Sequence, residues 1–273
     1  MSVKYVAITV LFMLFVSSVF AGVEFDGTDD VVTIPYSSSC EVDNDTALTI
    51  CCWVYVDGQD SGADTIVMTE AVAEGDGNEN VRLYITDGST SSTYKFNCSI
   101  LDADGNSVVV TESGEHSDGD GWHHVCMVLR SSDNYLRLFV DGVETGTPGL
   151  VSNGIGTNFD SGENWRIGSG EATRTRFFDG KLEELYFFKE TGLSDSQIAT
   201  LAKSKIRGIG LAWLNMGFYL PLNEGTVGTS ANGSTVQDVS KNDNDGTGNY
   251  GSNSSGLVWI ANTILKSIGI NTY

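Results

Sequence analysis

Basic residues are scarce in this chain: 15 Lys and Arg stand against 36 Asp and Glu, and the formal net charge is −21 at pH 7. Nucleic-acid binding requires a basic face that neutralises phosphates, so this composition excludes nucleic acid as a partner. Proline is also rare, with 3 residues, whereas glycine accounts for 32 of the 273. The length suits one large domain, or one domain with an appendage.

Long apolar runs are missing after the first 20 residues, so no later segment is long enough to cross a bilayer. At the N-terminus, Lys4 precedes an apolar run from Tyr5 to Phe20, and Ala21 ends a site that signal peptidase accepts. We predict that residues 1–21 are a signal peptide and that the mature chain is secreted or displayed on an extracellular surface. An uncleaved anchor is the alternative.

Cys-x-x-Cys pairs are absent, and the adjacent Cys51 and Cys52 point to opposite faces of a strand, which argues against a zinc site built on cysteine. Export permits disulfides. The five cysteines are Cys40, Cys51, Cys52, Cys98 and Cys126. Because five is odd, at least one thiol stays free or pairs with another chain.

Short runs of alternating apolar residues, separated by Gly, Asp, Asn and Ser, fill the chain from Val23 to Phe188 and predict an antiparallel sandwich or barrel. Asp87-Gly88, Asp104-Gly105 and Asp141-Gly142 suit two-residue hairpins because these pairs tolerate positive φ. The predicted strands are Asp30–Ile34, Leu48–Val56, Thr65–Met68, Val81–Thr86, Tyr94–Leu101, Ser107–Thr111, His123–Arg130, Tyr135–Val140, Trp165–Ile167 and Lys181–Phe188.

One helix is predicted after these strands, in "GLSDSQIATLAKSKIR". Ser194 suits the N-cap, with Gln197 reaching back to it, and Leu193 suits a hydrophobic staple onto Ile198. We expect the helix to cover one end of a sheet.

Four stretches resemble, in their order and spacing, the laminin-G-like and pentraxin-like branch of the concanavalin A-like lectin/glucanase superfamily. They are "VEFDGTDDVVTIP", "LTICCWVYV", "GWHHVCMVLR…YLRLFVDGVE" and "WRIGSG…FFDGKLEELYFFKETGLSDSQI". The resemblance implies an all-β, antiparallel jelly-roll sandwich of two curved sheets over residues 22–205. It also implies a disulfide between Cys51 and Cys126.

The same resemblance makes the Trp-His-His stretch the start of a central strand. Trp122 and Val125 are then expected to pack, while His123 or His124 meets a neighbouring backbone or solvent. Catalysis there requires a nucleophile or an acid beside the imidazoles, and none is evident in the sequence.

The tail, residues 206–273, follows the helix, whereas its "YLPLNEG" type of segment precedes the first strand in many relatives. Either it folds back to complete the sandwich or it begins a second, truncated repeat. We favour folding back, with Gly217–Leu222 pairing as a strand, because the tail's apolar residues could not be buried alone.

An enzymatic function has a definite test in this superfamily, since its glucanases place two glutamates on one strand as Glu-x-Asp-x-Glu. In "KLEELYFF" the adjacent Glu183 and Glu184 are expected to face opposite ways. The paired motif is absent, so we expect no catalytic activity.

Calcium is a candidate ion, because acidic and amide side chains in rim loops supply hard oxygen ligands. The acidic cluster of pentraxins is not carried over: only "EATRTR" lies between "IGSG" and "FFDG". The candidate ligands are Asp57, Asp60 and Asp64 in one loop, and Asp76, Asn78 and Glu79 in another. Solvated loop charge is the alternative interpretation.

Strand alternation indicates where a sugar would bind. If Val81, Leu83 and Ile85 face the core, the residues between them face outward, and the same holds for the strand at 135–140. Aromatic rings stack on sugars, and Arg or Lys binds carboxylate or sulfate. The predicted ligand-binding face carries Arg82, Tyr84, Lys95, Arg137 and Phe139.

The sequence therefore predicts an exported, non-enzymatic, lectin-like module that binds a glycan, a surface glycoconjugate or a protein partner. A structural or adhesion component of a cell surface or virion is the alternative. A polysaccharide hydrolase or lyase ranks third. Glycosylation sequons at Asn44, Asn97, Asn232 and Asn253 are left open, although a glycan on Asn97 would crowd the predicted face.

Overall fold

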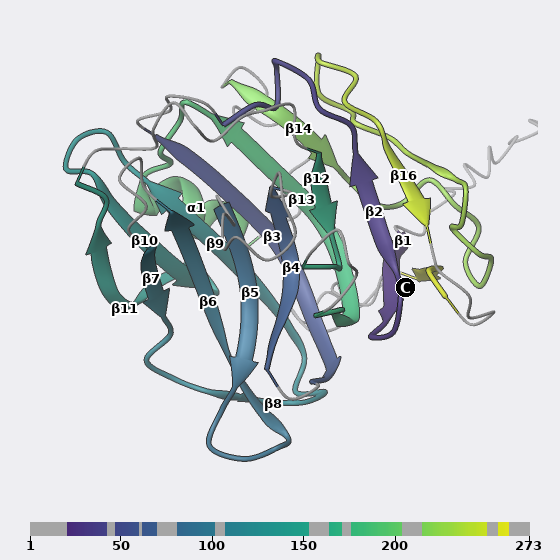
Figure 1. Cartoon of the computed structure of the whole chain (residues 1–273), viewed down its shortest axis with the longest axis horizontal. Coiled ribbons are helices and arrows are strands. Elements are labelled where there is room, and N and C mark those ends of the chain that lie inside the picture. The colour runs from purple at the N-terminus through teal and green to yellow at the C-terminus, as the bar shows by residue number, and fades with distance from the viewer. Residues whose placement is uncertain are drawn as a thin grey trace, which may run out of the picture.

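Two antiparallel sheets face each other across a hydrophobic core in the computed structural model (Figure 1). The predicted all-β sandwich with one short helix is confirmed for the residues that the structure describes. These are 21–42, 47–59, 62–69, 81–101, 107–152, 164–170, 176–203, 215–249 and 256–261. The expected signal peptide therefore lies outside them except for its last residue, Ala21.

The eight-stranded sheet has the order β11-β10-β9-β3-β13-β1-β17. The long strand β13 uses one edge for β3 and shares its other edge between β1 and β14. The strands of this sheet are β1 (Ala21–Asp26), β3 (Leu48–Gly58), β9 (Trp122–Leu129), β10 (Tyr135–Val140), β11 (Val143–Leu150), β13 (Asp179–Lys189), β14 (Met216–Leu220) and β17 (Val258–Ala261).

The nine-stranded sheet has the order β15-β16-β2-β12-β4-β5-β6-β7, and β8 pairs with β6. Its strands are β2 (Val31–Ile34), β4 (Ala63–Thr69), β5 (Val81–Asp87), β6 (Thr93–Leu101), β7 (Ser107–Thr111), β8 (His116–Ser117), β12 (Trp165–Ile167), β15 (Thr235–Val236) and β16 (Gly246–Asn249).

Alternation along the strands supplies the core between the sheets. On β5, for example, Val81, Leu83 and Ile85 are fully buried in it, as expected from the sequence. Trp165 is 1% exposed within this core, and its ring centroid is 4.6 Å from that of Phe187 and 5.2 Å from that of Phe218. The two sheets thus share one continuous apolar layer.

The helix α1 (Asp195–Leu201) begins at the predicted capping box: the Ser194 side chain accepts from the Gln197 backbone N–H, and the Gln197 side chain accepts from the Ser194 N–H. Its buried residues Ile198 and Leu201 pack on the outer face of the eight-stranded sheet, beside Leu193. No helix among the described residues has the length and apolar character needed to span a membrane.

The sequence analysis did not predict β1, β8, β11, β15 or β16 as strands. β1 starts at Ala21, and β11 contains exposed residues with two glycines and a proline, so its sequence lacks an apolar alternation. β11 is an edge strand, and the Asp141-Gly142 turn joins it to β10 with φ of 51° and 81°. Positive φ at both central residues matches the turn chemistry expected for this hairpin.

Cys51 and Cys126 form a disulfide between directly opposed residues of β3 and β9. It lies in the apolar cluster beneath α1. The bridge spans 75 residues and contributes about 3–5 kcal/mol to stability on the chain-entropy model. Cys40, Cys52 and Cys98 are buried and unbridged, and burial raises the pKa of all three thiols.

The tail contributes strands to both sheets. β14 pairs with β13 and β17 with β1 in the eight-stranded sheet, whereas β16 pairs with β2 in the nine-stranded sheet. The strand expected at Gly217–Leu222 is observed at Met216–Leu220, although the domain boundaries at residues 21 and 205 stay predictions. Phe218 and Leu220 are fully buried in the central core.

Phe218→Ala should therefore lower the free energy of unfolding by about 3–5 kcal/mol, because it removes a buried ring between the sheets. Val239→Ala, in the same tail but 53% exposed, is the control and should change stability by less than about 0.5 kcal/mol. Urea unfolding measures both. If Phe218→Ala is as stable as wild type, or if truncation after Arg207 leaves the melting temperature unchanged, the tail is a separate appendage.

Candidate functional site

The five residues predicted to form one sugar-binding face are divided between the two sheets. Arg82 and Tyr84 lie on β5 and Lys95 on β6, in the nine-stranded sheet, whereas Arg137 and Phe139 lie on β10 in the other. Both sets point away from the shared core, so they face opposite sides of the sandwich. The prediction of one face is wrong, because alternation gives the orientation of a side chain but not the sheet to which its strand belongs.

The two predicted residues on β10, Phe139 and Arg137, are engaged within their own sheet, although the Tyr135 ring beside Arg137 is 36% exposed. Phe139 is 1% exposed and packs in the apolar cluster beneath α1. The Arg137 guanidinium pairs with Asp133 at 2.5 Å and with Glu144 at 3.4 Å. These two side chains therefore stabilise their own sheet.

The residues of the predicted face that lie on β5 and β6 include an aromatic ring, Tyr84, which the Arg82 guanidinium contacts. The Arg82 guanidinium lies 4.3 Å from the centroid of the Tyr84 ring, and it also donates to Thr65 Oγ1 and to the Ala63 carbonyl, each at 2.8 Å. Arg82 is only 3% exposed, so the expectation that it faces solvent is wrong. Tyr84 and Lys95 are half-buried.

Asn97 lies opposite Tyr84 in the β5–β6 ladder and is 2% exposed. Its side-chain Nδ2 donates to Thr86 Oγ1 at 3.0 Å and to the Lys95 carbonyl at 2.9 Å. The folded protein thus uses this amide nitrogen internally, which disfavours glycan attachment at this sequon.

Glu183 and Glu184 do not face opposite ways, because a β-bulge interrupts the β13–β3 register between Glu183 and Tyr186. Both residues are buried, and Glu184 has a φ of 53°. Glu184 Oε2 accepts from the hydroxyls of Tyr186 and Tyr219, whose rings stack 4.3 Å apart on the outer face of the sheet. The extra bulge residue turns Glu184 toward this face.

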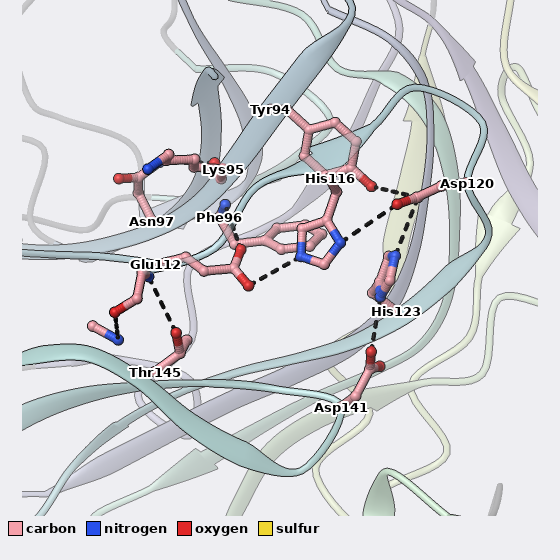
Figure 2. Close-up of polar contacts among 12 residues, drawn as sticks. Tyr94, Lys95, Phe96, Asn97, Glu112, His116, Asp120, His123, Asp141 and Thr145 are labelled. Atoms are coloured by element: carbon pink, nitrogen blue, oxygen red, sulfur yellow. Dashed lines mark hydrogen bonds and ion pairs between the residues drawn. The ribbon is translucent and has the colours of Figure 1, made fainter. Parts of the chain in front are cut away.

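A chain of imidazoles and carboxylates lies where β8 and the start of β9 meet β6 (Figure 2). Asp120 is central: its Oδ1 lies 3.2 Å from His123 Nε2, and its Oδ2 lies 3.5 Å from His116 Nδ1. Outside them, Glu112 Oε1 lies 3.0 Å from His116 Nε2, and Asp141 Oδ2 lies 2.8 Å from His123 Nδ1. The alternation is carboxylate, imidazole, carboxylate, imidazole, carboxylate.

Aromatic contacts and a hydrogen bond from Tyr94 hold the imidazoles and Asp120 in place. The two imidazole centroids are 4.2 Å apart, and the His116 ring stacks 5.5 Å from that of Tyr94, whose hydroxyl donates to Asp120 at 3.2 Å. Burial opposes protonation of His123, but its hydrogen bonds to Asp141 and Asp120 and their charges raise its pKa. Burial raises the pKa of Asp141, whereas the contact with His123 lowers it, and the net shift of this pKa is downward.

The sequence prediction missed this cluster, because it expected no acid beside the histidines. The signal was available in part as Glu112-x3-His116-x3-Asp120-x2-His123, but the contribution of Asp141 depends on tertiary structure. His124 points to the other face of β9, where its ring meets Trp53 edge-on at 5.4 Å. Burial lowers the pKa of His124 to about 4.

A family model of the concanavalin A-like lectin/glucanase superfamily matches residues 26–199. The chain belongs to this superfamily. The match includes strands β2 to β13, the first part of α1, and the residues of the β5–β6 face and of the imidazole–carboxylate chain, whereas the tail strands β14 to β17 lie beyond it. No curated protein sequence matches the chain.

Solved structures agree with the superfamily fold. A Bacteroides ovatus protein with a provisionally attributed carbohydrate-binding role is 17% identical, with a TM-score of 0.62 over 90% of this chain, which spans 61% of that protein's length. A heptameric SAP-like pentraxin from Limulus polyphemus is 17% identical over 68% of this chain and 83% of its own, with a TM-score of 0.50. The Ruminococcus gnavus IT-sialidase CBM40, solved with α2,3-sialyllactose, is 16% identical over 68% of this chain and 99% of its own, also with a TM-score of 0.50.

The predicted calcium ligands of this superfamily member lie partly within the described residues. Asp57 and Asp64 are not loop residues: they lie in β3 and β4, and Asp57 pairs with Lys181. Asp64 is buried. Asp60, Asp76, Asn78 and Glu79 lie outside the described residues, so the calcium site stays a prediction.

A different acidic cluster, Asp26, Asp29 and Asp30, lies at the turn between β1 and β2. Asp30 is fully buried and accepts backbone N–H groups from Asp26 at 2.9 Å and from Leu257 at 2.7 Å. It thereby ties the tail to the first two strands. Burial raises the pKa of Asp30 from 3.8 to about 6, against the effect of these hydrogen bonds.

The raised pKa predicts an unusual dependence of stability on pH. Between about pH 4 and pH 6 the folded state binds more protons at Asp30 than the unfolded state, so this residue's contribution to the free energy of unfolding falls as pH rises. Asp30→Asn cannot ionise, so the stability advantage of wild type over this variant should be greatest near pH 4 and decline toward pH 6. Urea unfolding of both proteins with a calcium chelator measures this difference. An advantage that grows with pH would contradict the raised pKa.

Proposed function

We propose that this protein is an exported, non-catalytic carbohydrate-binding module whose sugar contact is the outward face of β5 and β6. The observation that carries the proposal is the Tyr84 ring: it points away from the core, is half-buried, and is held by the Arg82 guanidinium at 4.3 Å. A sugar stacks on such a ring through its apolar C–H face.

The neighbouring cation favours an anionic glycan. Lys95 is half-buried on β6, two residues before Asn97, which is the cross-strand partner of Tyr84. The chain has a net charge of −21, so a lysine beside an outward aromatic ring supplies a localised positive charge that can bind a carboxylate or sulfate. Arg82 contributes by fixing the ring, which lowers the entropy lost when a ligand stacks on it.

The superfamily and its structural neighbours agree with this proposal. The Bacteroides ovatus protein has a provisional carbohydrate-binding attribution, and the CBM40 structure holds sialyllactose, an anionic glycan. Non-catalytic binding is supported by the glutamates of β13. Glu184 is committed to two tyrosine hydroxyls, and both carboxylates are buried, so they do not form an open pair flanking a glycosidic bond.

The test starts with a glycan array that includes sialylated and sulfated glycans. For the best ligand, Tyr84→Ala should weaken binding by about 1–3 kcal/mol, since a stacking ring is lost. Lys95→Ala should weaken an anionic ligand by about 1 kcal/mol or more, and added salt should have a similar effect. Isothermal titration calorimetry measures each affinity.

Arg137→Ala is the matched control, because it removes one cation from the opposite sheet and should leave glycan affinity unchanged. If Tyr84→Ala and Lys95→Ala bind as wild type while Arg137→Ala does not, the binding face is the other one. If the array is empty and the protein instead assembles with itself or adheres to a surface, the alternative role as a structural or adhesion component is favoured.

A further inference from the structure

We propose that His116, Asp120 and His123 form a binding site for one transition-metal ion of the Zn²⁺ class. Each residue offers one ligand atom, and these three atoms lie within 4.8 Å of one another. The bonds of tetrahedral zinc, about 2.0–2.2 Å, place neighbouring ligand atoms roughly 3.3 Å apart, so small side-chain rotations close the site.

The two outer carboxylates orient the imidazoles for such an ion. Glu112 holds Nε2 of His116 and Asp141 holds Nδ1 of His123, so the remaining nitrogens, His116 Nδ1 and His123 Nε2, both face Asp120. A metal-bound histidine usually donates its second N–H to a carboxylate or carbonyl, which fixes its tautomer. Here both imidazoles have that partner already in place.

The outer carboxylates are themselves anchored. Glu112 is 7% exposed, and its second oxygen, Oε2, accepts from the Phe96 backbone N–H at 3.3 Å. Asp141 Oδ1 accepts from the His124 backbone N–H at 2.9 Å. Each carboxylate thus uses one oxygen for the backbone and presents the other to an imidazole. Figure 2 shows this arrangement, with Asp120 between the two rings.

The donor set selects the class of ion. Two imidazole nitrogens and one carboxylate oxygen suit Zn²⁺ and its neighbours in the first transition row, whereas Ca²⁺ prefers oxygen ligands alone. A dication would also offset the three carboxylates that meet here when both histidines are neutral. Side-chain exposures of 16%, 31% and 14% for His116, Asp120 and His123 leave the site accessible.

The test uses the full chain after treatment with a chelator, titrated with Zn²⁺ against a chromophoric competitor. We expect one ion per chain and a higher melting temperature with Zn²⁺. His116→Gln and Asp120→Asn should each lower the affinity by at least about 100-fold, and Glu112→Gln by about 10–100-fold through loss of orientation. Glu115→Gln removes the same charge from an exposed neighbour that bonds Ser89 instead, and it should bind as wild type.

Binding of Co²⁺ to wild type provides a readout that does not depend on the variants folding. Visible absorption of four-coordinate Co²⁺ without a thiolate charge-transfer band supports the site, whereas a thiolate band assigns binding to the buried cysteines and overturns the proposal. Absence of Zn²⁺ binding by wild type, or unchanged affinity in His116→Gln and Glu112→Gln that retain native circular dichroism, would also overturn it.

Discussion

The pairing of β13 along both of its edges is the constraint on which the rest of the sandwich depends. One edge takes β3, and the other takes β1 from the start of the chain and β14 from the tail. Leu182, Leu185 and Phe187 of β13 face the core between the sheets. Since β1 and β3 precede β13 by over a hundred residues, the sheet cannot form from any local part of the sequence, and folding must bring the first strands and the tail together on β13.

Local signals were sufficient for much of the fold. A period of two in apolar residues predicts strands because neighbouring side chains of a strand point to opposite faces. The Ser194–Gln197 capping box predicts where α1 begins, and Asp141-Gly142 predicts a hairpin, because each depends on only a few consecutive residues. The Cys51–Cys126 disulfide required the resemblance to a family, since spacing alone does not give cysteine connectivity.

Features that depend on the order of strands in space were not predictable in this way. Arg82 and Arg137 both follow an alternating pattern, yet they lie on opposite faces of the molecule. The bulge at Glu184 reverses the facing of one residue, and nothing in "KLEELYFF" announces the extra residue. The imidazole–carboxylate chain shows the same limit: Glu112, His116, Asp120 and His123 are close in sequence, but Asp141 reaches His123 only because β9 and β10 are paired.

Strand β6 separates the two proposed sites by the same alternation that builds the core. Tyr94 and Phe96 point inward, where their rings contact His116 (Figure 2). Lys95 and Asn97 point outward, and Asn97 is the cross-strand partner of Tyr84. Energetic coupling between two sites requires an element with two discrete arrangements that both sites bias. β6 is held by seven residue pairs to β5 and five to β7, so a shift of this strand would break pairing on both sides. A metal ion at His116, Asp120 and His123 would therefore stabilise the rim of the sandwich, and a glycan on the opposite face of β6 would bind independently of it.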